Sequence, residues 1–144
     1  MKRFEFQLAR VRDYRCQQLE VEEVKLQSLL TERKALESEK LRLENEVADA
    51  RRSLMVTGSA ESQELVFLDS YLRHLAAEKK RHAIKVADWQ ARALKQREAV
   101  VDARRRVLLM EKLEVRQFEE WKTALNREQE NLAAELYLAR WRGV

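Results

Sequence analysis

Histidine is the residue type in this chain best suited to acid–base or metal chemistry, and it occurs only twice, as His74 and His82. The two lie about two helical turns apart, and no cysteine or acidic cluster completes a metal site around them. The glycines, Gly58 and Gly143, stand alone, so no phosphate-binding loop is present. No serine, threonine or cysteine has a base at a recognisable spacing. We therefore expect no catalytic residue, no metal site, no cofactor and no small-molecule substrate, and we predict that the protein is not an enzyme.

Basic residues are the next candidates, because 29 bases against 25 acids leave a net charge of +4. They cluster at Arg51-Arg52, Lys79-Lys80-Arg81 and Arg104-Arg105-Arg106, and each cluster is flanked by acids. Nucleic-acid binding favours a long one-sided basic stripe, which is absent here, so we expect no nucleic-acid partner. A peripheral membrane or nucleic-acid binder stays open as an alternative, and steep salt dependence would favour it.

The composition indicates long helices to carry these residues. Charged residues make up 38% of the chain, aromatic residues 7%, and proline is absent. Such a balance is typical of coiled coils. The one break is Thr57-Gly58-Ser59-Ala60, where glycine can end one helix and serine can cap the next. We predict an all-α fold, an antiparallel two-helix coiled-coil hairpin with a longer second helix. Residues 1–144 would form this single hairpin, with helix 1 at about 4–55, the turn at 56–60 and helix 2 at about 60–140.

A heptad pattern predicts which side chains line the contact between the two helices. On the first helix the seam reads Leu19, Glu22, Leu26, Leu29, Arg33, Leu36, Lys40, Leu43, Val47, Ala50 and Leu54. On the second it reads Leu65, Leu68, Leu72, Leu75, Lys79, His82, Val86, Trp89, Ala93, Gln96, Val100, Ala103, Val107 and Met110. Polar seam positions cost stability but can fix the register.

The two seams agree on one antiparallel register. Setting Leu54 against Leu65 brings the earlier leucines and valines of the first helix, such as Val47, Leu26 and Leu19, onto apolar positions of the second. The same register places Leu29 opposite Trp89 and Leu36 opposite His82. It also places Lys40 opposite Lys79, a like-charge layer unless both stems turn outward.

The register leaves the end of the second helix without a partner. Phe4, Leu8 and Val11 form a stripe of their own, and Phe4 would face roughly Val115. Beyond about Phe118 an apolar stripe continues through Trp121, Leu125, Leu132, Leu136 and Ala139. An exposed stripe of this kind marks an interaction site. Self-association and docking into another protein both remain open.

A second group of large side chains lies off the seam. Phe67, Tyr71 and His74 follow helical spacing and share one face close to the turn. They either cover the seam or form a recognition patch for a partner.

The opening residues resemble a known family. Phe4-Glu5-Phe6-Gln7-Leu8-Ala9-Arg10-Val11-Arg12-Asp13-Tyr14-Arg15 is similar to the start of the flagellar FliJ family, although Arg12 stands where that family has leucine. The resemblance implies a stalk and chaperone component of the flagellar type III protein export apparatus. It implies three partners: the flagellar export ATPase ring, the cytoplasmic domain of the export gate, and export chaperones. Injectisome stalk proteins look alike and are one alternative. A coiled-coil scaffold that self-associates through helix 2 is the other.

The resemblance also implies two binding surfaces. The gate-binding surface corresponds to Phe67, Tyr71 and His74, with a weaker counterpart at Leu41 and Ala48. The ring-binding end corresponds to Phe4, Leu8, Val11, Phe118, Trp121, Leu125 and Arg127. The lone cysteine, Cys16, suits a reducing compartment, and no apolar run has the length of a membrane span. We expect a cytoplasmic protein, peripheral at the cytoplasmic face of the inner membrane.

Overall fold

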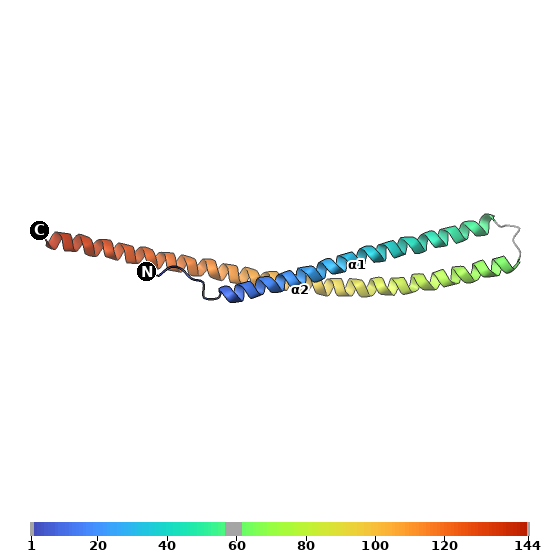
Figure 1. Ribbon diagram of the computed structural model, residues 1–144, viewed down its shortest axis with the longest axis horizontal. Coiled ribbons are helices and arrows are strands. Elements are labelled where there is room, and N and C mark those ends of the chain that lie inside the picture. The colour runs from blue at the N-terminus through green and yellow to red at the C-terminus, as the bar shows by residue number, and fades with distance from the viewer. Residues whose placement is uncertain (1, 57–61, 144) are drawn as a thin grey trace. The chain divides into compact units, whose positions relative to one another are not determined.

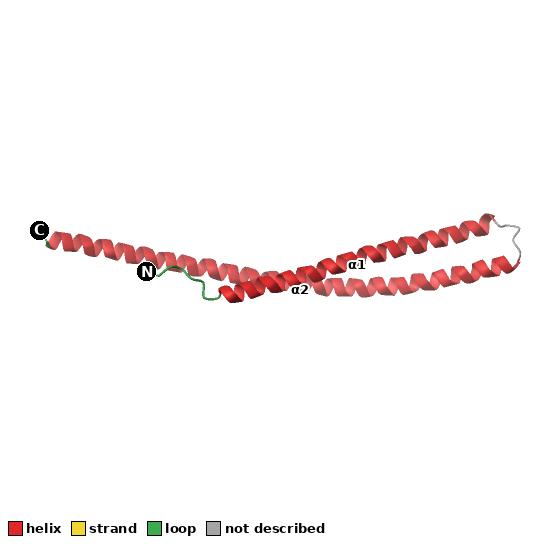
Figure 2. Cartoon of the chain, viewed as in Figure 1, coloured by secondary structure: helices red, strands yellow, loops and turns green. Residues whose placement is uncertain are grey.

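The chain folds into two long helices that pack against each other, as the computed structural model shows for residues 2–56 and 62–143. Helix α1 spans Ala9–Val56 and helix α2 spans Ser62–Arg142 (Figure 1). Everything else described is loop or turn, and no strand occurs in these two ranges (Figure 2). The all-α hairpin with a longer second helix is thus confirmed. The turn predicted at 56–60 falls almost wholly outside the described residues.

Two compact units divide the chain. The hairpin unit is Glu22–Ala99, and the terminal unit combines Met1–Val21 with Val100–Val144. Each unit contains a stretch of α1 packed against a stretch of α2. Neither helix holds, among its described residues, a segment apolar and long enough to cross a membrane.

The prediction that the first helix begins at about Phe4 was wrong. Residues 2–6 have no regular structure, and α1 begins at Ala9, whose N–H donates to the carbonyl oxygen of Phe6 (3.1 Å). Phe6 is buried within the terminal unit. A non-helical chain advances about 3.3 Å per residue, against 1.5 Å in a helix. The opening segment therefore reaches farther along α2 than a helix would.

The predicted seam is the core of the hairpin unit. Leu43 and Leu75 are its most buried side chains, with 2% and 1% of their surface exposed. The other buried seam residues of this unit are Ala50, His82, Trp89 and Ala93, and in the terminal unit they are Val100, Ala103 and Val107. Arg33, Lys40 and Lys79 lie in the seam by sequence position but are exposed. The heptad pattern therefore identified the contact surface of both helices.

A ladder of three hydrogen bonds fixes the register of the hairpin unit. His82 Nε2 donates to the carbonyl oxygen of Leu36 (2.8 Å), and Trp89 Nε1 donates to that of Leu29 (2.8 Å). One heptad farther, Gln96 Nε2 donates to the carbonyl oxygen of Glu22 (2.9 Å). Each rung moves seven residues forward on α2 and seven back on α1, which confirms the pairings of Leu36 with His82 and of Leu29 with Trp89. A change of register would separate each donor from the carbonyl oxygen that now accepts its hydrogen bond.

Ion pairs between the helices close one side of the hairpin unit. Arg92 bonds the Glu32 carboxylate (2.6 Å) and also Asp88 of its own helix (3.1 Å), and Lys85 lies 3.9 Å from Glu39. Lys85 and Arg92 are one heptad apart, as are Glu32 and Glu39. They define what we call the ion-pair flank, and the opposite side of the seam is the open flank.

The Arg92 pair makes part of the stability depend on pH. The Arg92 hydrogen bond holds the pKa of Glu32 below its ordinary value of 4.5. A lowered pKa contributes stability above the pKa of the unfolded state, and this contribution is lost as the pH falls through the folded value. We expect Glu32→Gln to lower the melting temperature by at most a few degrees at pH 7, and the gap to close as the pH drops below 4.5. Thermal melts followed by circular dichroism check this, with Glu44→Gln as the exposed control. A gap independent of pH would contradict it.

Candidate interaction surfaces

Three aromatic rings form the clearest cluster of the terminal unit. The Phe4 ring lies 5.3 Å from the Phe118 ring, edge to face, and 5.9 Å from the Trp121 ring. Phe118 and Trp121 stack with their centroids 5.7 Å apart. Trp121 Nε1 also donates to the carbonyl oxygen of Lys2 (3.1 Å). Aromatic pairs of this geometry stabilise a contact beyond the area they bury.

This cluster corrects two expectations. Phe4 contacts Phe118 and Trp121, which lie three and six residues beyond the expected Val115, itself largely exposed. The end of α2 is also covered farther than predicted, since the stripe beyond Phe118 has a partner in the opening segment. The physical reason is the non-helical path of residues 2–6, which extends the reach of the chain.

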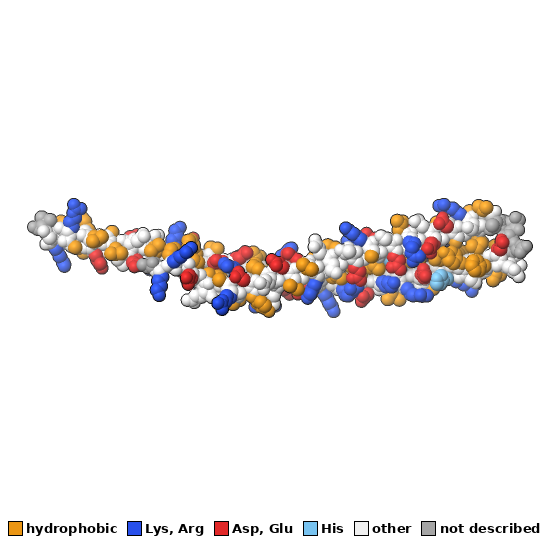
Figure 3. All heavy atoms as spheres, in the orientation of Figure 1, with side chains coloured by type: hydrophobic (Ala, Val, Ile, Leu, Met, Phe, Trp, Pro, Cys, Tyr) orange, Lys and Arg blue, Asp and Glu red, His pale blue; other side chains and the backbone are white. Residues whose placement is uncertain are grey.

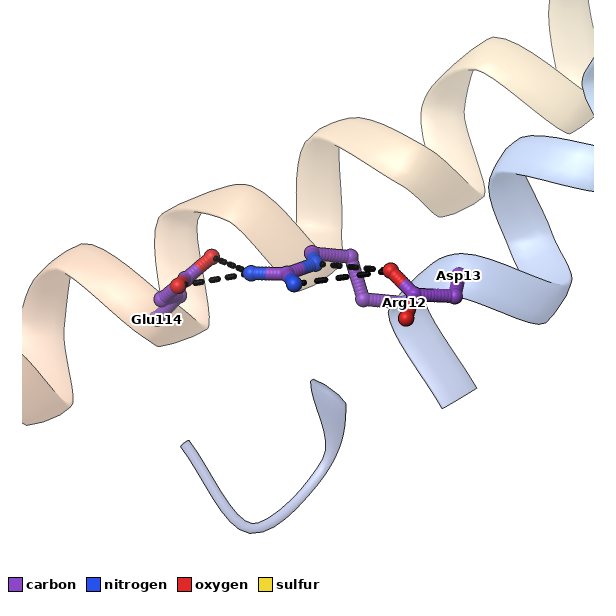
Figure 4. Close-up of polar contacts among 3 residues, drawn as sticks. All are labelled: Arg12, Asp13 and Glu114. Carbon is purple, nitrogen blue, oxygen red and sulfur yellow. Dashed lines mark hydrogen bonds and ion pairs between the residues drawn. The ribbon is translucent and has the colours of Figure 1, made fainter. Parts of the chain in front are cut away.

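A bidentate ion pair holds α1 to α2 beside this cluster. Arg12 Nη1 donates to both carboxylate oxygens of Glu114, each at 2.7 Å, and the guanidinium also approaches Asp13 at 3.4 Å (Figure 4). The hydrogen bond to Glu114 raises the pKa of Arg12 above its usual value. The same guanidinium lies 5.9 Å from the centre of the Phe6 ring. Arg12, where the FliJ pattern has leucine, thus orients the start of α1 and the segment before it.

The structure brings together only part of the predicted ring-binding end. Phe4, Phe118 and Trp121 are in mutual contact. Leu8 and Leu125 are half-buried, while Val11 and Arg127 are exposed. Farther along α2 a set of large side chains is exposed: Leu132, Leu136, Tyr137, Leu138 and Trp141.

Two aromatic residues of this set were not predicted as site residues. Tyr137 and Trp141 lie outside the apolar stripe that runs from Phe118 to Ala139, and Trp141 is 73% exposed. Hydrophobic side chains on the surface near this end of α2 are visible in Figure 3. The signal that could have found them is the scarcity of aromatics, which are only 7% of the chain.

The predicted gate-binding residues lie on two different sides of the hairpin unit. Phe67 is 73% exposed, Tyr71 is exposed, and His74 Nε2 lies 3.1 Å from Glu78. Tyr71 is two heptads before Lys85 and so belongs to the ion-pair flank. Leu41 follows Glu39 by two residues, about 200° around the helix, which places it on the opposite, open flank.

Ala48 lies one heptad beyond Leu41 and therefore shares the open flank, where it is half-buried. The predicted gate-binding residues of α1 and α2 thus do not share one face of the hairpin.

Residues 2–56 and 62–143 contain no group of three or more histidine, cysteine or acidic side chains placed to hold a metal ion. The candidate sites are instead exposed apolar and aromatic surfaces. The fold and these surfaces define the class, an antiparallel two-helix coiled coil. No protein-family model, curated protein or solved structure matches the chain. The resemblance to the FliJ family therefore rests on the opening residues that suggested it.

Proposed function

We propose that the protein is a non-enzymatic stalk and chaperone of the flagellar type III export apparatus, which couples the export ATPase ring to the export gate. The observation that carries the proposal is the packing and exposure of apolar side chains in the terminal unit. There the motif residue Phe4 docks on Phe118 and Trp121, and α2 continues past this contact with exposed apolar side chains. A helix that is apolar on several faces fits an enclosing partner such as the lumen of a ring.

Gate binding is the second half of the proposal. The exposed group of Phe67, Tyr71 and His74 supplies two aromatic anchors on one flank of α2, and aromatic residues dominate the energetics of many interfaces. Leu41 and Ala48 lie on the open flank and would need a separate contact with the gate. Transport of export chaperones by the same hairpin belongs to this proposal.

The test is a titration of the purified protein into a flagellar export ATPase, with hexamer formation followed by light scattering and ATP turnover measured together. We expect both to increase. Leu125→Ala should weaken the effect roughly tenfold or more, because it removes a half-buried apolar side chain next to the aromatic cluster. Circular dichroism should show nearly unchanged helicity, and Ile84→Ala, an exposed site of the hairpin unit, serves as the control.

Two further variants separate ring binding from the docking of the opening segment. Phe4→Ala removes the phenyl group that contacts Phe118 and Trp121 but leaves these two side chains in place. Trp121→Ala removes the indole that would contact the ATPase. If Trp121 binds the ring directly, the first variant retains binding and the second loses it. Absence of any effect of the parent protein on hexamer formation and turnover would reject the stalk.

A self-associating scaffold is the second candidate, and a specific observation favours it. The side chains Leu132, Leu136, Tyr137, Leu138 and Trp141 are all more than half exposed. A concentration-dependent mass of the protein alone, abolished by Leu136→Ala, would support this candidate over the stalk.

A further inference from the structure

The open flank of the hairpin unit contains a hollow in the seam. Its floor is formed by His82, Val86, Trp89 and Ala93, of which three are buried and Val86 is half-buried. Two seam positions of α1 that lie on either side of Leu36 line this hollow, and they carry Arg33 and Lys40. Both side chains are exposed, and the Arg33 guanidinium lies over the Trp89 ring, whereas Lys40 does not fill the space over the floor.

The rim of the hollow is cationic. Arg33, Lys40 and Arg97 line it together with a single acid, Glu37. Glu37 already pairs with Arg33 Nε (3.0 Å), and the Arg33 guanidinium lies 5.8 Å from the centre of the Trp89 ring. Lys40 and Arg97 have no ion-pair partner within residues 2–56 and 62–143. Two positive charges are thus left unbalanced beside an apolar floor.

The two flanks of the hairpin unit differ in this respect. On the ion-pair flank, Arg92 and Lys85 reach across the seam to Glu32 and Glu39. On the open flank, Leu94 stands exposed at the rim beside Lys40 and Arg97. The open flank therefore offers apolar contact and uncompensated positive charge together.

We propose that this hollow is the docking site of an acidic amphipathic helix from a protein partner, which lies along the open flank as a third strand of the coiled coil. Its leucine side chains would cover the half-buried Val86 and the exposed Leu94, beside Lys40, which leaves that part of the seam unfilled. Its carboxylates would pair with Lys40 and Arg97, which have no ion-pair partner among the described residues. The proposal is independent of the export role, since it uses neither the aromatic cluster nor Phe67, Tyr71 and His74.

The probe for the test is a pair of synthetic helical peptides with leucine at heptad core positions, one with glutamate and the other with lysine at the flanking positions. Trp89 reports binding by fluorescence in the full chain carrying Trp121→Phe and Trp141→Phe. The acidic peptide should change Trp89 emission saturably, and the basic peptide should not. Lys40→Glu with Arg97→Glu should weaken acidic-peptide binding roughly ten- to thirtyfold and allow the basic peptide to bind.

Lys95→Glu is the matched control, because Lys95 is exposed and lies two residues, about 200° around α2, from Arg97. It should leave the affinity for the acidic peptide unchanged. Equal binding of both peptides, or indifference to Lys40→Glu and Arg97→Glu, would overturn the proposal. So would self-association of the protein alone that the same charge reversals abolish, because a second copy would then occupy the hollow. All of these measurements omit the ATPase, so their outcome does not depend on the stalk.

Discussion

Leu75→Ala should remove about 2–5 kcal/mol from the free energy of unfolding, which is a large share of the stability of a small domain. Leu75 and Leu43 are the two most buried side chains, with 1% and 2% of their surface exposed. A two-helix hairpin has one seam, so a cavity there cannot be filled from another layer. Urea titration followed by circular dichroism at 222 nm measures the loss.

Leu41→Ala is the matched control for this change, because it deletes the same atoms from a side chain that is 59% exposed. Its effect should stay within about 0.5 kcal/mol. Leu43→Ala should resemble Leu75→Ala. The register of the hydrogen-bond ladder, continued by one heptad, sets Leu43 opposite Leu75. Together the two substitutions should therefore cost less than the sum of their separate effects, since both enlarge one shared space. A Leu75→Ala protein as stable as the parent would mean that the hairpin does not hold its seam in solution.

Trp89→Ala should have the second large effect, a loss of about 3–5 kcal/mol. The substitution removes a buried ring and, with it, one rung of the hydrogen-bond ladder. Trp89→Phe divides these contributions, because phenylalanine retains an apolar ring but loses part of the indole volume and the N–H that donates to the carbonyl oxygen of Leu29. We expect that variant to lose about 1 kcal/mol through the hydrogen bond, plus a smaller packing term.

Register can be measured in the same series. A disulfide between Leu26→Cys and Ala93→Cys, in a Cys16→Ser background, should form readily in the parent register, which brings these seam positions together. His82→Leu and Gln96→Leu remove the other two polar rungs while retaining bulk. We expect the parent to form this cross-link cleanly and the double leucine variant to form it along with cross-links of slipped registers. Trp141→Ala, at an exposed aromatic, should change neither stability nor cross-linking. A leucine variant with unaltered cross-linking would assign the register to apolar packing alone.

The repeating part of this fold could be predicted from the sequence. Leucines at heptad spacing on both sides of Gly58 specify two helices and the stripe that each buries, because an α-helix brings residues three and four apart onto one face. The register followed as well, because the short break around Gly58 sets Leu54 against Leu65, and the two seams then pair position by position. Leu36 opposite His82 and Leu29 opposite Trp89 are its direct results.

The opening segment shows where such reasoning stops. Phe4, Leu8 and Val11 have helical spacing, yet residues 2–6 are not helical and only Ala9 begins α1. Local spacing favours a helix, whereas contact with Phe118 and Trp121 favours an extended path. These aromatic side chains lie more than a hundred residues away in the sequence, so no local pattern contains their effect.

What the sequence by itself determined is therefore the helices, their seams and their register, because periodicity is a property of neighbours along the chain. Only the tertiary structure decided which flank each seam neighbour occupies. It placed Glu32 and Glu39 within reach of Arg92 and Lys85, and it left Lys40 and Arg97 at a hollow without an ion-pair partner in the part of the chain that the structure describes. The reason is physical. Heptad spacing predicts that a side chain faces the other helix. The direction that a long arginine or lysine side chain then takes depends on which carboxylates of that helix come within reach.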